Sequence, residues 1–167
     1  MTMRAHADAA EGLKMLKDAG FRMVTLTNSP QVPGGKSPLE NANLDKYFEL
    51  QFSIEAARAY KPAQVVYHMV AQELDVPPQE CCLVATHVWD TIGARSAGMA
   101  GGPLTRPGNA ILPIASLPQP NLVAPDLPAL ARKMIDSFQP APTGAPETQH
   151  CIKKTPATHH TTLAECA

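Results

Sequence analysis

The alternation of helical and strand-like hydrophobic patterns is the feature that most constrains how this chain folds. Apolar residues at helical spacing in "ADAAEGLKMLKDAG" lead into the strand-like run "FRMVTLTN". The alternation continues through "ELQFSIEAA", a helical segment after Lys61-Pro62, "CCLVAT", "TIGARSAGM", "GGPLTRPG" and "APDLPALARKMIDSF". This order predicts an α/β fold with a mostly parallel sheet and helices on both faces. Ligands of such folds bind at the carboxyl ends of the strands.

The ends of several predicted helices are marked by capping residues. Ser37 is followed by Pro38 and, three residues on, by Glu40, a capping-box pattern that predicts a short helix. Asp126 is placed to cap the final helix. Gly20 can adopt the left-handed conformation that ends the first helix.

Composition limits the class of protein and its partners. With 167 residues, of which 44% are hydrophobic, the chain is predicted to form one domain around a single core. Its 14 basic and 15 acidic residues are scattered and leave a net charge of -1, so we expect no nucleic acid partner. No apolar run approaches the roughly 20 residues that cross a bilayer, and "MTMRAHADAAEGLKMLK" contains no apolar signal core. A cytoplasmic protein without a membrane partner is the resulting expectation.

The cysteines and the last residues give two further predictions. Cys81 and Cys82 are adjacent in a predicted strand, where successive side chains point to opposite faces, so we expect reduced thiols. Residues 137–167 are rich in Pro, Thr and Ala and are predicted to form a disordered tail behind a domain at 1–136. Cys151, His159, His160 and Cys166 lie in that tail, but their spacing matches no compact zinc site, and no metal or other cofactor is predicted.

Candidate site residues follow strands or begin helices. The segment "GGKS" at residues 34–37 is not a phosphate-binding loop, because Pro30 stands where that motif needs a glycine. The remaining candidates are Thr27, Asn28, Lys61, Trp89 and Asp90. Three of them have a purely structural alternative: Asn28 can shape a turn, Lys61 can be a solvated residue before a helix, and Asp90 can be a helix N-cap.

The candidate residues, taken together with their flanking segments and in this order, resemble a known protein superfamily. The segments "TLTN", "YKPA", "VATHVWD" and "GARSAGM" resemble the core domain of the haloacid dehalogenase superfamily, which is a Rossmann-like α/β fold. Within it, the Trp-Asp pair and the later "TRPGN" and "PNLVAPDLPALA" are similar to the type II (S)-2-haloacid dehalogenases. The resemblance covers residues 7–135 and implies hydrolytic removal of halide from a small 2-haloalkanoic acid.

The resemblance assigns a role to each candidate residue. It implies that Thr27 and Asn28 bind the substrate carboxylate and the departing halide, and that Lys61 balances carboxylate charge. It also implies that Asp90 orients the lysine and the hydrolytic water, while Trp89 lines the substrate pocket. An indole N–H and an amide are weakly solvated donors suited to a soft halide. His87 stands where these dehalogenases carry an asparagine, and it can replace that amide as a donor or simply hold a local partner.

A second branch of the superfamily hydrolyses phosphate esters with magnesium. Those phosphatases carry an additional acid four or five residues before the one that matches Asp90, where this chain has Ala85 and Thr86. A hard cation would find too few oxygen ligands there, so metal-independent dehalogenation is the better interpretation. Ala85 is itself a departure, since dehalogenases of this type carry a serine at that position.

The larger departure concerns the nucleophile. The family's reaction begins with an aspartate in a D-x-x-x-T/V pattern at the end of a central first strand. This chain contains no such motif, so we expect a partial core without that strand and without the helical cap, unable to turn over substrate. The flanking strands would then pair directly, or a partner chain would supply a strand, with a homodimer as one such assembly. A noncatalytic interaction module that uses exposed sheet edges is the alternative from a different functional class.

Overall fold

Buried, β-prone runs form the centre of the molecule. The computed structural model describes residues 4–30, 34–138 and 161–164. The sheet is built from β1 (Arg22–Thr27), β2 (Leu50–Ser53), β3 (Cys81–Ala85), β4 (Ala100–Pro103) and β5 (Thr161–Ala164). The helices are α1 (Ala9–Asp18), α2 (Pro38–Asn41), α3 (Gln64–Glu73), α4 (Val88–Ser96) and α5 (Leu127–Phe138), with single 3₁₀ turns at Asp45–Tyr47 (η1) and Pro78–Glu80 (η2). The predicted α/β class is therefore confirmed.

The five strands form one sheet in the order β2-β1-β5-β3-β4, and every neighbouring pair is parallel. The middle strand comes from the far end of the sequence. Leu163 of β5 is in register with Val24 on one side and with Leu83 on the other. The predicted mostly parallel sheet is thus confirmed, and no partner chain is needed to complete it.

Two alternatives expected for the middle of the sheet, direct pairing of the flanking strands or a strand from a partner chain, are wrong. Strands β1 and β3 do not pair with each other, and the strand between them belongs to the same chain. The four residues of β5 also lie within the segment predicted to be disordered. The physical reason is that β1 and β3 each present a row of backbone donors and acceptors, and leaving buried groups unpaired costs about 1 to 3 kcal/mol each. The remaining tail residues, with the four considered as zinc ligands, lie outside the described part of the chain.

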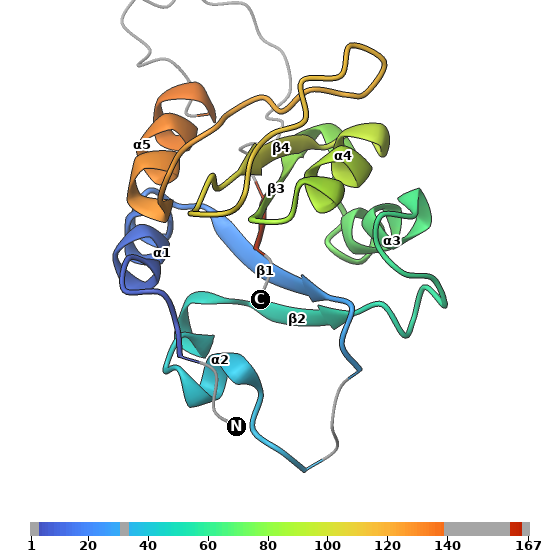
Figure 1. Ribbon diagram of the computed structural model, residues 1–167. Coiled ribbons are helices and arrows are strands. Elements are labelled where there is room, and N and C mark those ends of the chain that lie inside the picture. Colours follow the sequence, from blue (N-terminus) through green and yellow to red (C-terminus); the bar gives the residue numbers. More distant parts are fainter. Residues whose placement is uncertain (1–3, 31–33, 139–160, 165–167) are drawn as a thin grey trace, which may run out of the picture.

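Helices cover both faces of the sheet. Helices α1 and α5 pack side by side against one face, while α3 and α4 lie on the other (Figure 1). The α1/α5 side contains buried Leu13, Leu16 and Leu130, and the α3/α4 side contains buried Val66, Tyr67 and Val70. None of the described helices is long and apolar enough to cross a membrane.

Helix boundaries agree with the capping residues at three of the predicted positions, one of which is Gly20, left-handed with φ +85° just after α1. The Ser37–Glu40 capping box is present, and Asp126 accepts a hydrogen bond of 2.8 Å from the backbone of Ala129. Helix α4 begins earlier than predicted, with His87 as its N-cap residue. Asp90 is therefore not the N-cap but lies in the first turn.

Candidate active site

Asn28 and Lys61 join the end of β1 to the segment that precedes α3. The Asn28 side-chain Oδ1 accepts a hydrogen bond of 3.0 Å from the backbone N–H of Lys61. The Lys61 ammonium donates to the backbone oxygen of Leu26, 3.1 Å away in β1. Two bonds therefore hold the lysine against the carboxyl end of a central strand, which is where ligands bind in parallel α/β folds.

Lys61 and Asp90 form a buried ion pair. The Nζ of Lys61 lies 3.5 Å from Oδ1 of Asp90, and their side chains are 0% and 9% exposed. Removing two charges from water is unfavourable unless they are paired and hydrogen-bonded, so a buried pair at a strand end is weak evidence for stability and better evidence for function. The pairing excludes the alternative of a solvated Lys61.

The backbone of Asp90 is fixed from the α3 side. The fully buried hydroxyl of Tyr67 donates to the backbone oxygen of Asp90 at 3.0 Å. Gly93, one turn further along α4, allows this approach, because a Cβ at that position would lie 2.5 Å from the Tyr67 hydroxyl oxygen and 2.7 Å from Cβ of Pro62. Close packing of α4 on α3 therefore positions the carboxylate.

Of the other candidates, Thr27 is half-buried, while His87 and Trp89 lie nearer to solvent. Thr27 Oγ1 accepts a hydrogen bond of 3.0 Å from the backbone of Ser29, so its hydroxyl holds the turn after β1. His87 is exposed, and Trp89 is 58% exposed in the first turn of α4. The structure thus links Asn28, Lys61 and Asp90 directly, while the roles of Thr27, His87 and Trp89 stay predictions.

No cluster of three or more His, Cys, Asp or Glu side chains suited to a metal ion occurs among the described residues. Near the ion pair, the positions that would carry a second acid are Ala85, which is buried at the end of β3, and Thr86. The described side chains around Asp90 therefore do not fit a magnesium site.

A second set of residues was not anticipated from the sequence. Arg106 forms two hydrogen bonds to the Asp8 carboxylate, at 3.0 and 2.9 Å, across 98 residues of sequence. Asp8 also accepts a bond of 2.9 Å from the backbone of Leu127. Burial opposes ionisation of Asp8, but these hydrogen bonds outweigh it, so the pKa of Asp8 lies below its usual value. No local pattern could have paired residues so far apart.

Comparison with known proteins agrees with this fold. The family model of haloacid dehalogenase-like hydrolases matches residues 3–98. The (S)-2-haloacid dehalogenase 4A of Burkholderia cepacia is 32% identical over 107 residues, covering 64% of this chain and 46% of that protein. Phosphoglycolate phosphatase of Colwellia psychrerythraea is 30% identical over 98 residues, covering 59% and 43%. The chain thus spans about half the length of these curated relatives.

The solved structure of L-2-haloacid dehalogenase from Xanthobacter autotrophicus with chloropropionic acid covalently bound shares the fold. The TM-score is 0.67 at 23% identity, over 83% of this chain and 63% of that one. The fold and the family match define the class as a Rossmann-like α/β hydrolase. This chain belongs to the haloacid dehalogenase-like hydrolases.

Proposed function

We propose that the Lys61–Asp90 site binds a small 2-haloalkanoic acid, and that this chain alone does not release its halide. The observation that carries the proposal is the link from Asn28 to buried Lys61 and from Lys61 to Asp90 at the end of β1. Four (S)-2-haloacid and haloacetate dehalogenases among the relatives support the same substrate class.

The chemistry of the three residues suits an anion that carries a soft leaving group. The Lys61 ammonium supplies positive charge in a site of low dielectric, where its attraction for a carboxylate is stronger than in water. Because Asn28 uses its amide oxygen to bind Lys61, its amide N–H groups are the part of this exposed side chain that can donate to a ligand. Asp90 pairs with the lysine and holds it in place.

Halide release needs a carbon-halogen bond to break and a new bond to the same carbon to form. In the dehalogenases that this chain resembles, an aspartate attacks that carbon, halide leaves, and water opens the resulting ester. None of the five described strands is followed directly by an aspartate. In the sequence β5 is followed by Glu165, which lies outside the described residues. Binding without turnover is therefore the function proposed for this chain.

Two other candidate functions are less well supported. A phosphatase function is favoured by the similarity to the phosphoglycolate phosphatase of Colwellia psychrerythraea. However, Ala85 and Thr86 provide no second carboxylate for magnesium. An interaction module would use exposed sheet edges, yet β5 fills the middle of the sheet. The outer edge of β4 is also bonded, since Gly101 exchanges hydrogen bonds with Asn121.

A fluorescence titration tests the proposed binding. Trp89 is the single tryptophan, so its emission reports on the start of α4 without interference from other indoles. We expect 2-chloropropionate to change the emission saturably and propionate to have a weaker effect. Asn28→Ala should weaken the response because it removes the amide donor at the end of β1, whereas Asn41→Ala, at another exposed asparagine, should not. Equal responses to both acids, or an unchanged response in Asn28→Ala, would contradict the proposal.

A further inference from the structure

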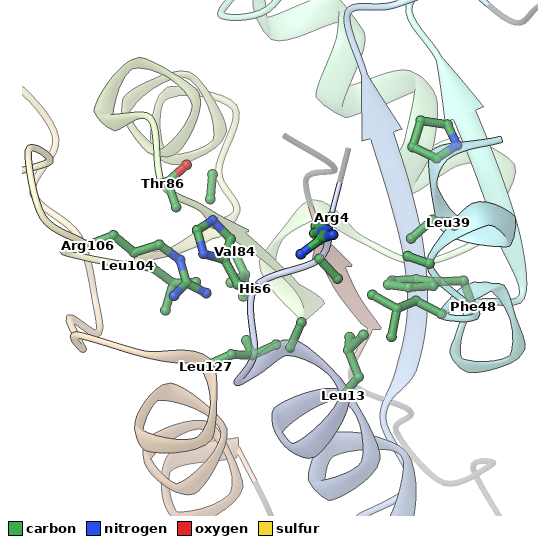
Figure 2. Close-up of a pocket in the computed structure, with 16 residues that line it drawn as sticks. Arg4, His6, Leu13, Leu39, Phe48, Val84, Thr86, Leu104, Arg106 and Leu127 are labelled. Atoms are coloured by element: carbon green, nitrogen blue, oxygen red, sulfur yellow. The ribbon is translucent and has the colours of Figure 1, made fainter. Parts of the chain in front are cut away.

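A second hollow lies mainly on the α1/α5 side of the sheet and reaches Ala85 and Thr86 at the end of β3, near the Lys61–Asp90 pair. It has a volume of about 220 Å³ and opens at the carboxyl ends of β3 and β4, between the N-terminal segment, α2 and the start of α5 (Figure 2). Thr27, Asn28, Lys61 and Asp90 are not among the residues that line it. We call this hollow the α1/α2 cavity.

The walls of the α1/α2 cavity are apolar. Leucine side chains from α1, α2, the segment after β4 and the start of α5 line it together with Phe48: Leu13, Leu39, Leu104 and Leu127. An apolar cavity of about 150 Å³ is large enough to hold benzene. The α1/α2 cavity can therefore accept a body slightly larger than one aromatic ring, and burying it there is favourable because water is released from apolar surface.

The polar groups at the mouth of the cavity are predominantly basic. Arg4 and His6 come from the exposed N-terminal segment, and Arg106 reaches the same opening from the segment after β4 (Figure 2). No aspartate or glutamate is found among the described residues that line the cavity. Arg106 is paired with Asp8, which holds its guanidinium in position.

Arg106 also retains an unused donor. Its Nε is buried and has no hydrogen-bond partner among the residues that the structure describes. A buried donor without an acceptor is unfavourable by about 1 to 3 kcal/mol in general. A hydrogen bond from this Nε to a ligand acceptor would remove that penalty, so it would stabilise binding more than a hydrogen bond to a donor exposed to water. Apolar walls, a basic mouth and an unused donor together select an amphiphilic anion.

From this geometry we infer that the α1/α2 cavity is a second binding site, for a compact aryl or alkyl carboxylate. The apolar body would fill the space among the leucines, and the carboxylate would face Arg4, His6 and the Nε of Arg106. A multiply charged phosphate suits it less well, because most of the lining offers no hydrogen bonds to replace its hydration.

Methyl NMR of the full chain tests this site with 3-phenylpropionate as the probe. We expect saturable shifts at Leu39, Leu104 and Leu127, weaker binding of 3-phenylpropanamide by about tenfold, and no such shifts with 3-phenylpropylamine. Arg4→Gln should weaken 3-phenylpropionate about two- to fivefold, as expected for one exposed charge. Equal binding of the acid and the amide would overturn the inference.

A matched pair of variants locates the ligand. Ala9 lines the cavity, whereas the adjacent Ala10 is exposed and does not. Ala9→Phe should therefore abolish binding, and Ala10→Phe should leave it unchanged. Asn28→Ala should also leave it unchanged, and 2-chloropropionate should not compete. Competition by 2-chloropropionate, or binding that survives Ala9→Phe, would overturn the inference. Neither result would contradict the function proposed for Lys61 and Asp90.

Discussion

Lys61 of the segment before α3 and Asp90 of α4 form an ion pair of 3.5 Å in which both side chains are almost completely buried. Asp90→Asn would leave the lysine without its counter-charge in a dry environment. We expect it to lower the free energy of unfolding by about 3 to 5 kcal/mol. Urea denaturation measures this loss.

The double variant Lys61→Met/Asp90→Asn is the control for that loss. It removes both charges and keeps similar volumes, so it should recover much of the lost stability. Lys14→Gln breaks an exposed pair with Asp18 on α1 and should have no measurable effect. If the double variant is no more stable than Asp90→Asn, the loss of stability in Asp90→Asn does not come from leaving a buried charge unpaired.

Asp8 should make the stability of the folded protein depend on pH. Because its pKa is lowered in the folded state, Asp8 contributes stability that is fully present above the unfolded value of about 3.9 and is lost as pH falls through the lower folded value. Asp8→Asn should therefore be less stable at pH 7 but lose less further stability between pH 5 and pH 2. Urea midpoints across that range give the comparison, with Asp18→Asn as the exposed control. Parallel pH profiles for Asp8→Asn and the wild type would contradict this role.

Strand β5 should be essential for the fold. Leu163→Pro removes a backbone donor between β1 and β3, so we expect a loss of at least about 1 to 3 kcal/mol and binding of a hydrophobic dye. Leu163→Ala keeps that N–H and is the matched control. Hydrogen exchange at Val24 and Leu83, the register partners of Leu163, reports the same change. Unchanged protection in Leu163→Pro would mean that the middle strand is dispensable.

The buried thiols should react only when the protein unfolds. Burial raises the pKa of Cys81 to about 11 and that of Cys82 to about 12, so almost no thiolate is present at pH 8. In a Cys151→Ser/Cys166→Ser background, alkylation by iodoacetamide should follow the unfolding curve in urea. Rapid labelling in native buffer would contradict the burial of these strand residues.

The sequence predicted those features that local patterns encode. Lys61 and Asp90 could be assigned to one edge because each stands next to a recognisable strand or helix terminus, and parallel strands bring such termini together. The capping box at Ser37 depends only on residues three positions apart, and it is present. The start of α4 was placed too late because Asp90 was considered as an N-cap, whereas that position belongs to His87.

Long-range contacts could not be predicted in the same way. The run Thr161–Ala164 is too short to show a clear period, and its strand conformation depends on β1 and β3, which bond it on both sides. The pairing of Arg106 with Asp8 likewise depends on the fold, since no helical or strand period spans 98 residues. The α1/α2 cavity follows from such contacts and had no signal in the sequence.

Halide release from 2-chloropropionate by the purified full chain is the most direct test of the account. The central claim is that the chain carries a binding site of the dehalogenase type without the attacking carboxylate, so release should equal that of buffer and of the Asp90→Asn variant. Release clearly above buffer that is lost in Asp90→Asn would contradict the claim. In that case Glu165→Gln would show whether the residue after β5 supplies the missing carboxylate.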